Sequence, residues 1–232
     1  MKWPRHKAGG SMKKIIMAGF IVFVGGLLSL QITQAQGTVY LSNLNQPSTY
    51  FRPVGSNSWF AAEFETGNNP GGYTLNSIQL AMTNAAGNPS GFTVMIYNGV
   101  SIPSGAGIFR PGSSLGILDG TADPSTAGIY SYTGGSSLLL SPSTNYFIVV
   151  TAGTFFLMNA YKWSLADTSY YNSSGGFLEV SFYSSINGSS WNVQDAYPQF
   201  AINATPVPEP TPSLLLLFGS GIFVYVRRDF LR

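Results

Sequence analysis

The amino-acid sequence predicts an all-β protein: an antiparallel β-sandwich, jelly-roll-like, with an N-terminal signal helix and a short C-terminal transmembrane helix beside it. Short apolar and aromatic runs alternate with Gly, Pro, Asn and Ser clusters between residues 36 and 204. No stretch of this part keeps a 3.6-residue apolar period over three turns, which disfavours helices. Two uncharged apolar runs lie outside it. Many short strands with Gly and Pro turns are typical of sandwiches.

Residues 1–35 have the three parts of a secretory signal peptide. Lys13 and Lys14 precede an uncharged apolar run, residues 15–30, and a small residue, Ala35, ends the polar exit. Basic start, apolar middle and small residue together mark the site of cleavage, which we expect after Ala35. Met12 is an alternative start of the chain. An uncleaved anchor is the other interpretation, although 16 residues are few for a span of roughly 20 residues.

The first predicted strands follow from apolar alternation between turn signals. Ile78, Leu80 and Met82 alternate with polar or small residues, as do Phe92, Val94 and Ile96, so each set lies on one face of a strand. Dense Gly, Pro and Asn clusters separate these segments and predict turns. The strands expected here are residues 59–64, 73–82 and 92–97, with a loop over residues 101–114.

The second half of the domain shows the same alternation of short apolar runs and turn clusters. Gly134-Gly135 separates two short apolar segments and predicts a hairpin between residues 130–133 and 137–140. Residues 146–151 form the most apolar run, which suits a central strand. The remaining expected strands are residues 115–118, 161–165, 177–183 and 199–202.

Charge is sparse and unevenly distributed. Charged residues make up only 9% of the chain, and residues 1–35 hold five Lys or Arg and no acid. Residues 36–206 hold three basic and seven acidic residues, a net charge of −4. A nucleic-acid interface requires a basic patch, so this composition excludes nucleic acid as a partner.

Few residue types for catalysis are present. The chain has no cysteine, and its one histidine, His6, precedes the predicted cleavage site. Catalysis by Ser-His or Cys-His pairs and histidine- or thiolate-bound metals are therefore excluded, and we expect no catalytic residue, cofactor or metal. Ser-Lys chemistry would need Lys162, which we interpret as a surface lysine in a strand.

Acidic residues leave two alternatives. Glu63 and Glu65 are two apart, so on a strand they share a face about 7 Å apart. Paired carboxylates can hydrolyse glycosides, although such acids must lie on opposite sides of the sugar. Residues 119–123 hold Asp119 and Asp123, which can offer oxygen ligands to calcium, but a polar turn is favoured because the loop lacks alternating Asp or Asn.

Aromatic residues suggest a carbohydrate-binding alternative. Flat rings flanked by amide groups suit sugars, and Tyr170, Tyr171, Trp191 and Asn192 lie in loop-like segments. These four are the candidate ligand-binding residues. Trp59 and Trp163 lie in predicted strands, where packing is the favoured interpretation.

The C-terminal 28 residues form three segments in order. Residues 205–212 are a Pro-rich spacer, residues 213–226 are apolar and uncharged, and residues 227–232 are a basic tip. Fourteen apolar residues fall short of the roughly 17–25 of a full span. Arginines beside an apolar run favour the cytoplasmic side of a membrane.

This tail resembles the PEP-CTERM sorting signal of exported bacterial proteins. The motif residues are Pro208, Glu209 and Pro210, and Arg227 and Arg228 close the signal. The resemblance implies processing by an exosortase, a membrane cysteine protease-transpeptidase. A plain membrane anchor with a proline stalk is the alternative.

The domain of residues 36–204 also resembles, more weakly, the choice-of-anchor domains that precede such tails. The resemblance rests on residues 59–67, 73–80, 140–146 and 161–163. It implies an extracellular β-sandwich without established activity. We therefore expect an exported, non-enzymatic protein of the cell surface, outer membrane or extracellular matrix. Its expected partners are signal peptidase, exosortase, the membrane and, as the alternative function, exopolysaccharide.

Overall fold

The computed structural model describes residues 37–103, 107–120, 122–134, 138–157 and 159–209. The signal segment of residues 1–35 and the apolar run of residues 213–226 lie outside this part. Within the described residues all regular structure is β, and no helix is long and apolar enough to cross a membrane. The prediction of an all-β, antiparallel domain is confirmed.

Fifteen strands are present in the described residues, and every pairing between them is antiparallel. They are β1 (Thr38–Ser42), β2 (Tyr50–Val54), β3 (Trp59–Glu65), β4 (Tyr73–Ala86), β5 (Thr93–Ser101), β6 (Phe109–Gly120), β7 (Gly128–Thr133), β8 (Leu139–Leu140), β9 (Asn145–Thr151), β10 (Ala160–Ala166), β11 (Asn172–Ser173), β12 (Leu178–Ser185), β13 (Asn192–Gln194), β14 (Tyr197–Pro198) and β15 (Phe200–Pro206).

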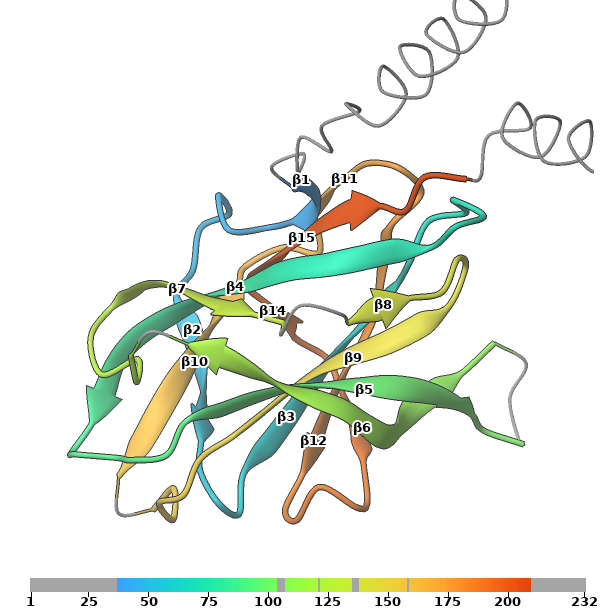
Figure 1. The fold of residues 1–232 in the computed structure, drawn as a ribbon. Helices are drawn as coiled ribbons and strands as arrows, with labels where there is room; N and C mark the ends of the chain where they lie inside the picture. The colour runs from blue at the N-terminus through green and yellow to red at the C-terminus, as the bar shows by residue number, and fades with distance from the viewer. Residues whose placement is uncertain (1–36, 104–106, 121, 135–137, 158, 210–232) are drawn as a thin grey trace, which may run out of the picture. The chain divides into compact units, whose positions relative to one another are not determined.

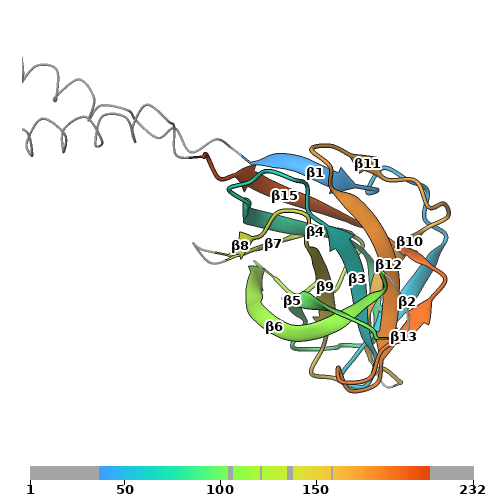
Figure 2. The ribbon, with the colours of Figure 1, turned by 90° about the vertical axis from the view of Figure 1, so that its right-hand side faces the viewer.

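The strands form two layers (Figures 1 and 2). One layer runs β11-β1-β15-β4-β7, with β10, β2, β14 and β8 paired beside β4 and β10. The other runs β6-β5-β9-β3-β12-β13. β6 also pairs with β7 through Asp119↔Thr133 and Gly120↔Tyr132, so the two layers are joined at one side.

The main hydrophobic core lies between these layers. Its largest fully buried side chains include Trp163, Tyr161 and Phe182, and the rings of Trp163 and Phe182 meet edge to face at 5.8 Å. Trp163 Nε1 donates to the carbonyl of Gln199 at 2.9 Å, so its one polar atom is satisfied. Packing, the favoured interpretation for Trp163, is confirmed.

A second cluster covers the other face of β3, β9 and β5. Phe147 and Val149 of β9 belong to it, together with Ala61, Met95 and Tyr183, whereas Ile148 belongs to the main core. β9 is thus buried on both faces and pairs with β3 and β5, as expected of a central strand. The Tyr183 hydroxyl donates to the Phe109 carbonyl, which brings β12 toward β6 across this face.

Two sequence expectations were wrong. The loop predicted over residues 101–114 is strand from Phe109 onward, because β6 begins there and pairs with β5 from Ser101↔Phe109. Pro111 and Gly112 are accommodated beside irregular register positions, which tolerate such residues. The expected hairpin is also absent from the described residues: β7 pairs with β4 and β6, and β8 pairs with β4.

Candidate functional site

The predicted sorting motif, Pro208, Glu209 and Pro210, follows the last strand of the described residues, β15, after a single residue, Val207. β15 remains paired with β4 as far as Pro206↔Tyr73. Val207 then makes the last backbone contacts: its N–H donates to the Gly72 carbonyl at 3.0 Å, and its carbonyl accepts from Asn69 Nδ2 at 3.1 Å. Beyond it, Pro208 and Glu209 are exposed.

The turn that holds Val207 is itself well ordered by local bonds. Asn69 Nδ2 also donates to the Gly72 carbonyl at 2.6 Å, and the Gly72 N–H donates to the Asn69 carbonyl at 2.8 Å. Gly72 has φ +74°, a conformation that favours glycine. The remaining motif residues Pro210, Arg227 and Arg228 lie outside the described residues.

The start of β1 lies beside the end of β15. Thr38 pairs with Ala204 in the antiparallel register, so the chain enters and leaves the domain at neighbouring positions (Figure 1). Asn43, fully buried, reinforces this pairing: its Nδ2 donates to the Pro198 carbonyl at 3.0 Å, and its Oδ1 accepts from the Phe200 N–H at 2.9 Å. Ala35, the predicted cleavage residue, lies outside the described residues.

Tyr170 and Tyr171 differ in environment. Tyr170 is 61% exposed. Tyr171 packs against the main core, with its ring 5.6 Å from that of Phe200 and its hydroxyl donating to the Pro198 carbonyl at 3.1 Å. Only Tyr170 thus presents most of its ring to solvent.

Trp191 and Asn192 belong to another part of the domain. Trp191 is partly buried against the second cluster, on the outer face of β3, β9 and β5. Asn192 begins β13 and is exposed. The structure therefore assigns Tyr171 and Trp191 to different clusters and does not gather the four candidate residues around one cavity.

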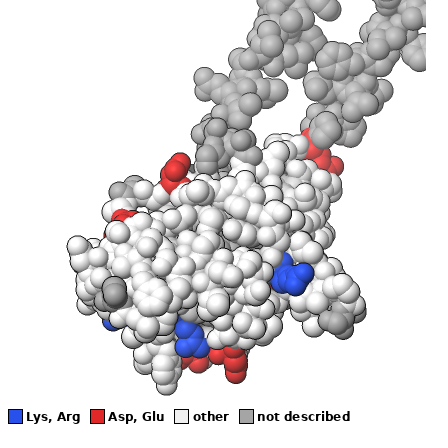
Figure 3. Space-filling model, turned by 90° about the horizontal axis from the view of Figure 1, so that it is seen from below, with Lys and Arg blue, Asp and Glu red and all other residues white. Residues whose placement is uncertain are grey.

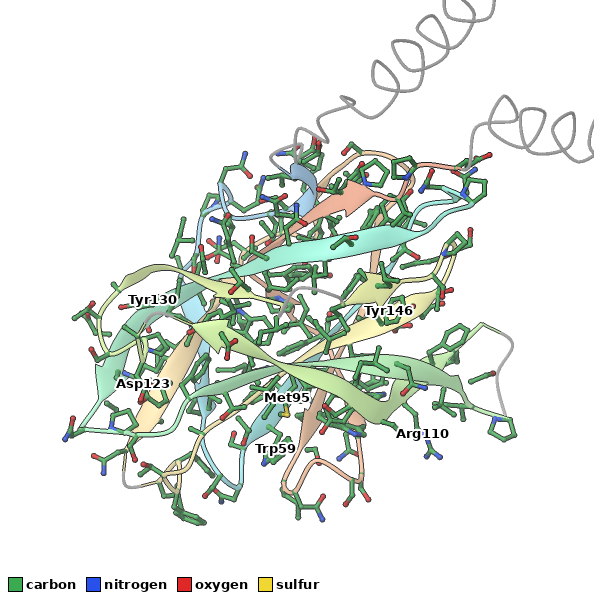
Figure 4. The ribbon with its side chains drawn as sticks, viewed as in Figure 1. Trp59, Met95, Arg110, Asp123, Tyr130 and Tyr146 are labelled. Atoms are coloured by element: carbon green, nitrogen blue, oxygen red, sulfur yellow. The ribbon has the colours of Figure 1, made fainter. Side chains whose placement is uncertain are left out.

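Trp59 also belongs to the second cluster (Figure 4). Its Nε1 donates to the Ser56 carbonyl at 2.9 Å. Gly188, with φ +75°, lies against the indole ring: a Cβ there would be 2.8 Å from Cε3 and Cζ3. The loop between β12 and β13 therefore lies close to the six-membered ring of the indole.

Glu63 and Glu65 are not equivalent. Glu63 is fully buried, and its Oε1 accepts from Asn145 Nδ2 at 3.0 Å. Glu65, at the end of β3, is partly exposed. In this structure a substrate cannot contact Glu63, so the two carboxylates cannot flank a glycosidic bond.

The residues considered for calcium serve the fold. Asp123 Oδ2 accepts from the Tyr161 hydroxyl at 2.7 Å and from the Gly91 N–H at 3.2 Å (Asp123 is labelled in Figure 4). Asp119 lies in β6, paired with Thr133 of β7. No group of three or more His, Cys, Asp or Glu among the described residues could hold a metal ion.

A groove that the sequence did not reveal lies where β2, the end of β10 and the β13–β14 connection meet. It has a volume of about 390 Å³ and is lined by residues 50–52, 165–167 and 195–197. The lining includes Arg52, Asp167, Asp195 and two tyrosines, Tyr50 and Tyr197. The run Tyr50-Phe51-Arg52 was the only signal in the sequence, and it gave no indication that two distant aspartates would join it.

Lys162 lies near this groove on β10. Its Nζ is 4.7 Å from the centre of the Phe51 ring, a cation–π contact between neighbouring strands. The side chain is partly buried. This arrangement accounts for Lys162 structurally, as a partner of Phe51.

Comparison of the chain with protein-family models, with curated proteins and with solved structures found no match.

Proposed function

We propose that this chain is an exported bacterial protein of the cell surface or extracellular matrix, sorted through a PEP-CTERM signal and without catalytic activity of its own. In this proposal signal peptidase removes residues 1–35, and an exosortase reads Pro208, Glu209 and Pro210. The flanking helices and the jelly-roll-like description of the sandwich belong to the same proposal.

The observation that carries this proposal is the position of the motif relative to the fold. Among the described residues, Val207 is the last one held by backbone hydrogen bonds to the domain, and Pro208 and Glu209 follow it as exposed residues. A protease needs its recognition segment outside a sheet, because paired backbone groups cannot bind elsewhere. Prolines lack the N–H of a further sheet bond and favour an extended backbone. Pro208 and Glu209 are thus accessible while the domain stays folded.

The start of the domain fits the same proposal. β1 begins at Thr38, so cleavage after Ala35 leaves two residues before the first strand. Since Thr38 and Ala204 are paired neighbours, a membrane segment before β1 and one after β15 would attach at one edge of the domain. Such an arrangement allows both ends to be processed beside the same membrane.

The test is mass spectrometry of the mature protein from cells with an active exosortase. We expect a C-terminus near Pro208–Pro210, and we expect Glu209→Ala to leave the tail uncut. Pro206→Ala is the matched control, because Pro206 lies two positions before the motif but belongs to β15. An intact terminus at Arg232 in the unmodified protein would contradict the proposal.

Carbohydrate binding is the second candidate function. The observation in its favour is a groove with exposed rings and charged side chains rather than the loop aromatics alone. The glycoside hydrolase alternative has less support, since Glu63 is fully buried.

A further inference from the structure

The groove between β2, the end of β10 and the β13–β14 connection is built by strand register. Tyr50 pairs with Leu165, and Ala166 pairs with Tyr197, so residues from three strands are adjacent. Leu165 and Ala166 are buried and form an apolar floor. Tyr50 lines the groove and is 67% exposed, so most of its side chain is available to a ligand.

Arg52 is an unusual lining residue. Its backbone lies opposite Trp163 of the core, and its Nε is buried without a hydrogen-bond partner among the described residues. A guanidinium offers five donors and no acceptor, so burial without full pairing costs free energy. A ligand that accepts hydrogen bonds from the remaining guanidinium donors would offset part of this cost.

Two carboxylates face the same groove. Asp167 Oδ1 accepts from the Thr49 N–H at 3.0 Å and from the Thr49 hydroxyl at 2.7 Å, which fixes this carboxylate at the rim. Asp195 is exposed in the connection from β13 to β14. Fixed carboxylates accept hydrogen bonds from hydroxyl groups.

The surface continues past this groove. A second hollow of about 270 Å³ shares residues 195–197 with the first and extends over Ser181 and Phe182 of β12 and Val193 and Gln194 of β13. Residues 195–197 line both hollows, so the two hollows are continuous with each other. This shape suits a chain of several units better than one small molecule.

The lining chemistry defines the ligand class. Hydroxyl groups both donate and accept, which matches carboxylates beside a guanidinium, and a tyrosine ring provides a rigid amphipathic contact. An anionic ligand is disfavoured, because two carboxylates and one guanidinium line the groove, the nearby Lys162 is engaged with the Phe51 ring, and residues 36–206 carry a net charge of −4. Charged residues are scattered on the face in Figure 3, without a basic patch. An apolar ligand would leave these charges desolvated.

We propose that this groove binds a segment of a neutral polysaccharide, with Tyr50 as the stacking platform and Arg52, Asp167 and Asp195 as the hydroxyl-binding groups. The proposal rests on the second candidate function and gives it a site distinct from Tyr170, Tyr171, Trp191 and Asn192. It does not depend on C-terminal processing.

The test uses the full-length chain purified in detergent and measures binding to soluble polysaccharides by calorimetry. The neutral probes are galactomannan, dextran and hydroxyethylcellulose, and the anionic probes are alginate and polygalacturonate. We expect at least one neutral probe to bind and the anionic probes to bind more than about tenfold more weakly, a difference of about 1.4 kcal/mol.

Variants locate the site. Tyr50→Ala and Asp195→Asn should each weaken binding about tenfold, whereas Tyr170→Ala should change it less than about twofold. Tyr170 is the matched control, since it is 61% exposed against 67% for Tyr50 and does not line the groove. Thermal unfolding of each variant shows whether the fold is retained.

Three results would overturn the proposal: no binding of any neutral probe, stronger binding of the anionic probes, or unchanged binding by folded Tyr50→Ala. Loss of binding in Tyr170→Ala alone would indicate that the ligand binds at the loop residues Tyr170, Tyr171, Trp191 and Asn192 instead. C-terminal processing would remain untouched by each of these results, so a failure here is distinct from a failure of the sorting proposal.

Discussion

The hydrogen bond between Tyr161 and Asp123 offers a sharp test of how the two layers are held together. Tyr161 is fully buried on β10, and its hydroxyl lies 2.7 Å from Asp123 Oδ2 and 3.0 Å from the Pro89 carbonyl. Asp123 lies in the connection between β6 and β7, so the bond links this connection to β10. Tyr161→Phe removes the hydroxyl and leaves the ring packing against Phe92 in place.

The expected cost is about 2 kcal/mol of unfolding free energy, because hydrogen bonds to charged groups contribute about 1.5–3 kcal/mol. For a domain of this size that lowers the melting temperature by about 4–8 °C. Urea unfolding followed by tryptophan fluorescence measures the free energy directly. Tyr170→Phe is the matched control, because Tyr170 is largely exposed, and its change should stay within about 0.5 kcal/mol.

A double-mutant cycle assigns the loss to the pair. If the two side chains interact as described, Asp123→Asn and Tyr161→Phe should be coupled by about 1 kcal/mol or more. Coupling below about 0.5 kcal/mol, or a Tyr161→Phe variant as stable as the parent, would refute the reasoning. Either outcome would mean that ring packing alone positions Tyr161.

Three further predictions concern the same domain. Burial raises the pKa of Tyr161 and of Tyr132, and Asp123 raises both further. Tyrosines of the unfolded chain ionise near pH 10, whereas Tyr161 and Tyr132 stay neutral in the fold. Their contribution to the free energy of unfolding is therefore complete below that pH and is lost progressively as the pH rises above it. The urea concentration at the unfolding midpoint should decrease from about pH 9 to about pH 11, and a flat profile would contradict this. Asn43→Ala should cost more than about 2 kcal/mol, since two buried backbone groups lose their partner, whereas a loss under about 1 kcal/mol in urea unfolding would show that water replaces the amide. Gly188→Val should cost about 2 kcal/mol and shift tryptophan emission, because a branched side chain at φ +75° is strained and clashes with the Trp59 ring; unchanged emission and stability would disprove the contact.

The domain's fold class could be read from local patterns. Alternation over Ile78, Leu80 and Met82 predicted β4, and the apolar run over residues 146–151 predicted the central strand β9. Such patterns are local properties of a strand, because its side chains alternate between faces. β1 and β2 were missed because they are short and partly exposed, so their apolar alternation is weak.

Pairing could not be read in the same way. β10 pairs with β4, β2 and β14, which are separated from it by long stretches of chain. β7 and β8 each pair with β4 although the turn signal Gly134-Gly135 lies between them in the sequence. Which strands pair depends on how whole faces of the sheet are buried, whereas a turn signal in the sequence concerns only the few residues that form it.

By itself the sequence determined the all-β character of the domain and the resemblance of its tail to the PEP-CTERM signal. Composition, charge segregation and the order of Pro-Glu-Pro, apolar run and arginines are properties of the chain alone. Tertiary structure alone decided which side chains meet. It buried Glu63, assigned Tyr171 and Trp191 to different clusters, and brought Arg52 together with Asp167 and Asp195. Asp167 and Asp195 are more than a hundred positions from Arg52 in the chain, and only the pairing of strands that are distant in sequence brings the three residues to one groove.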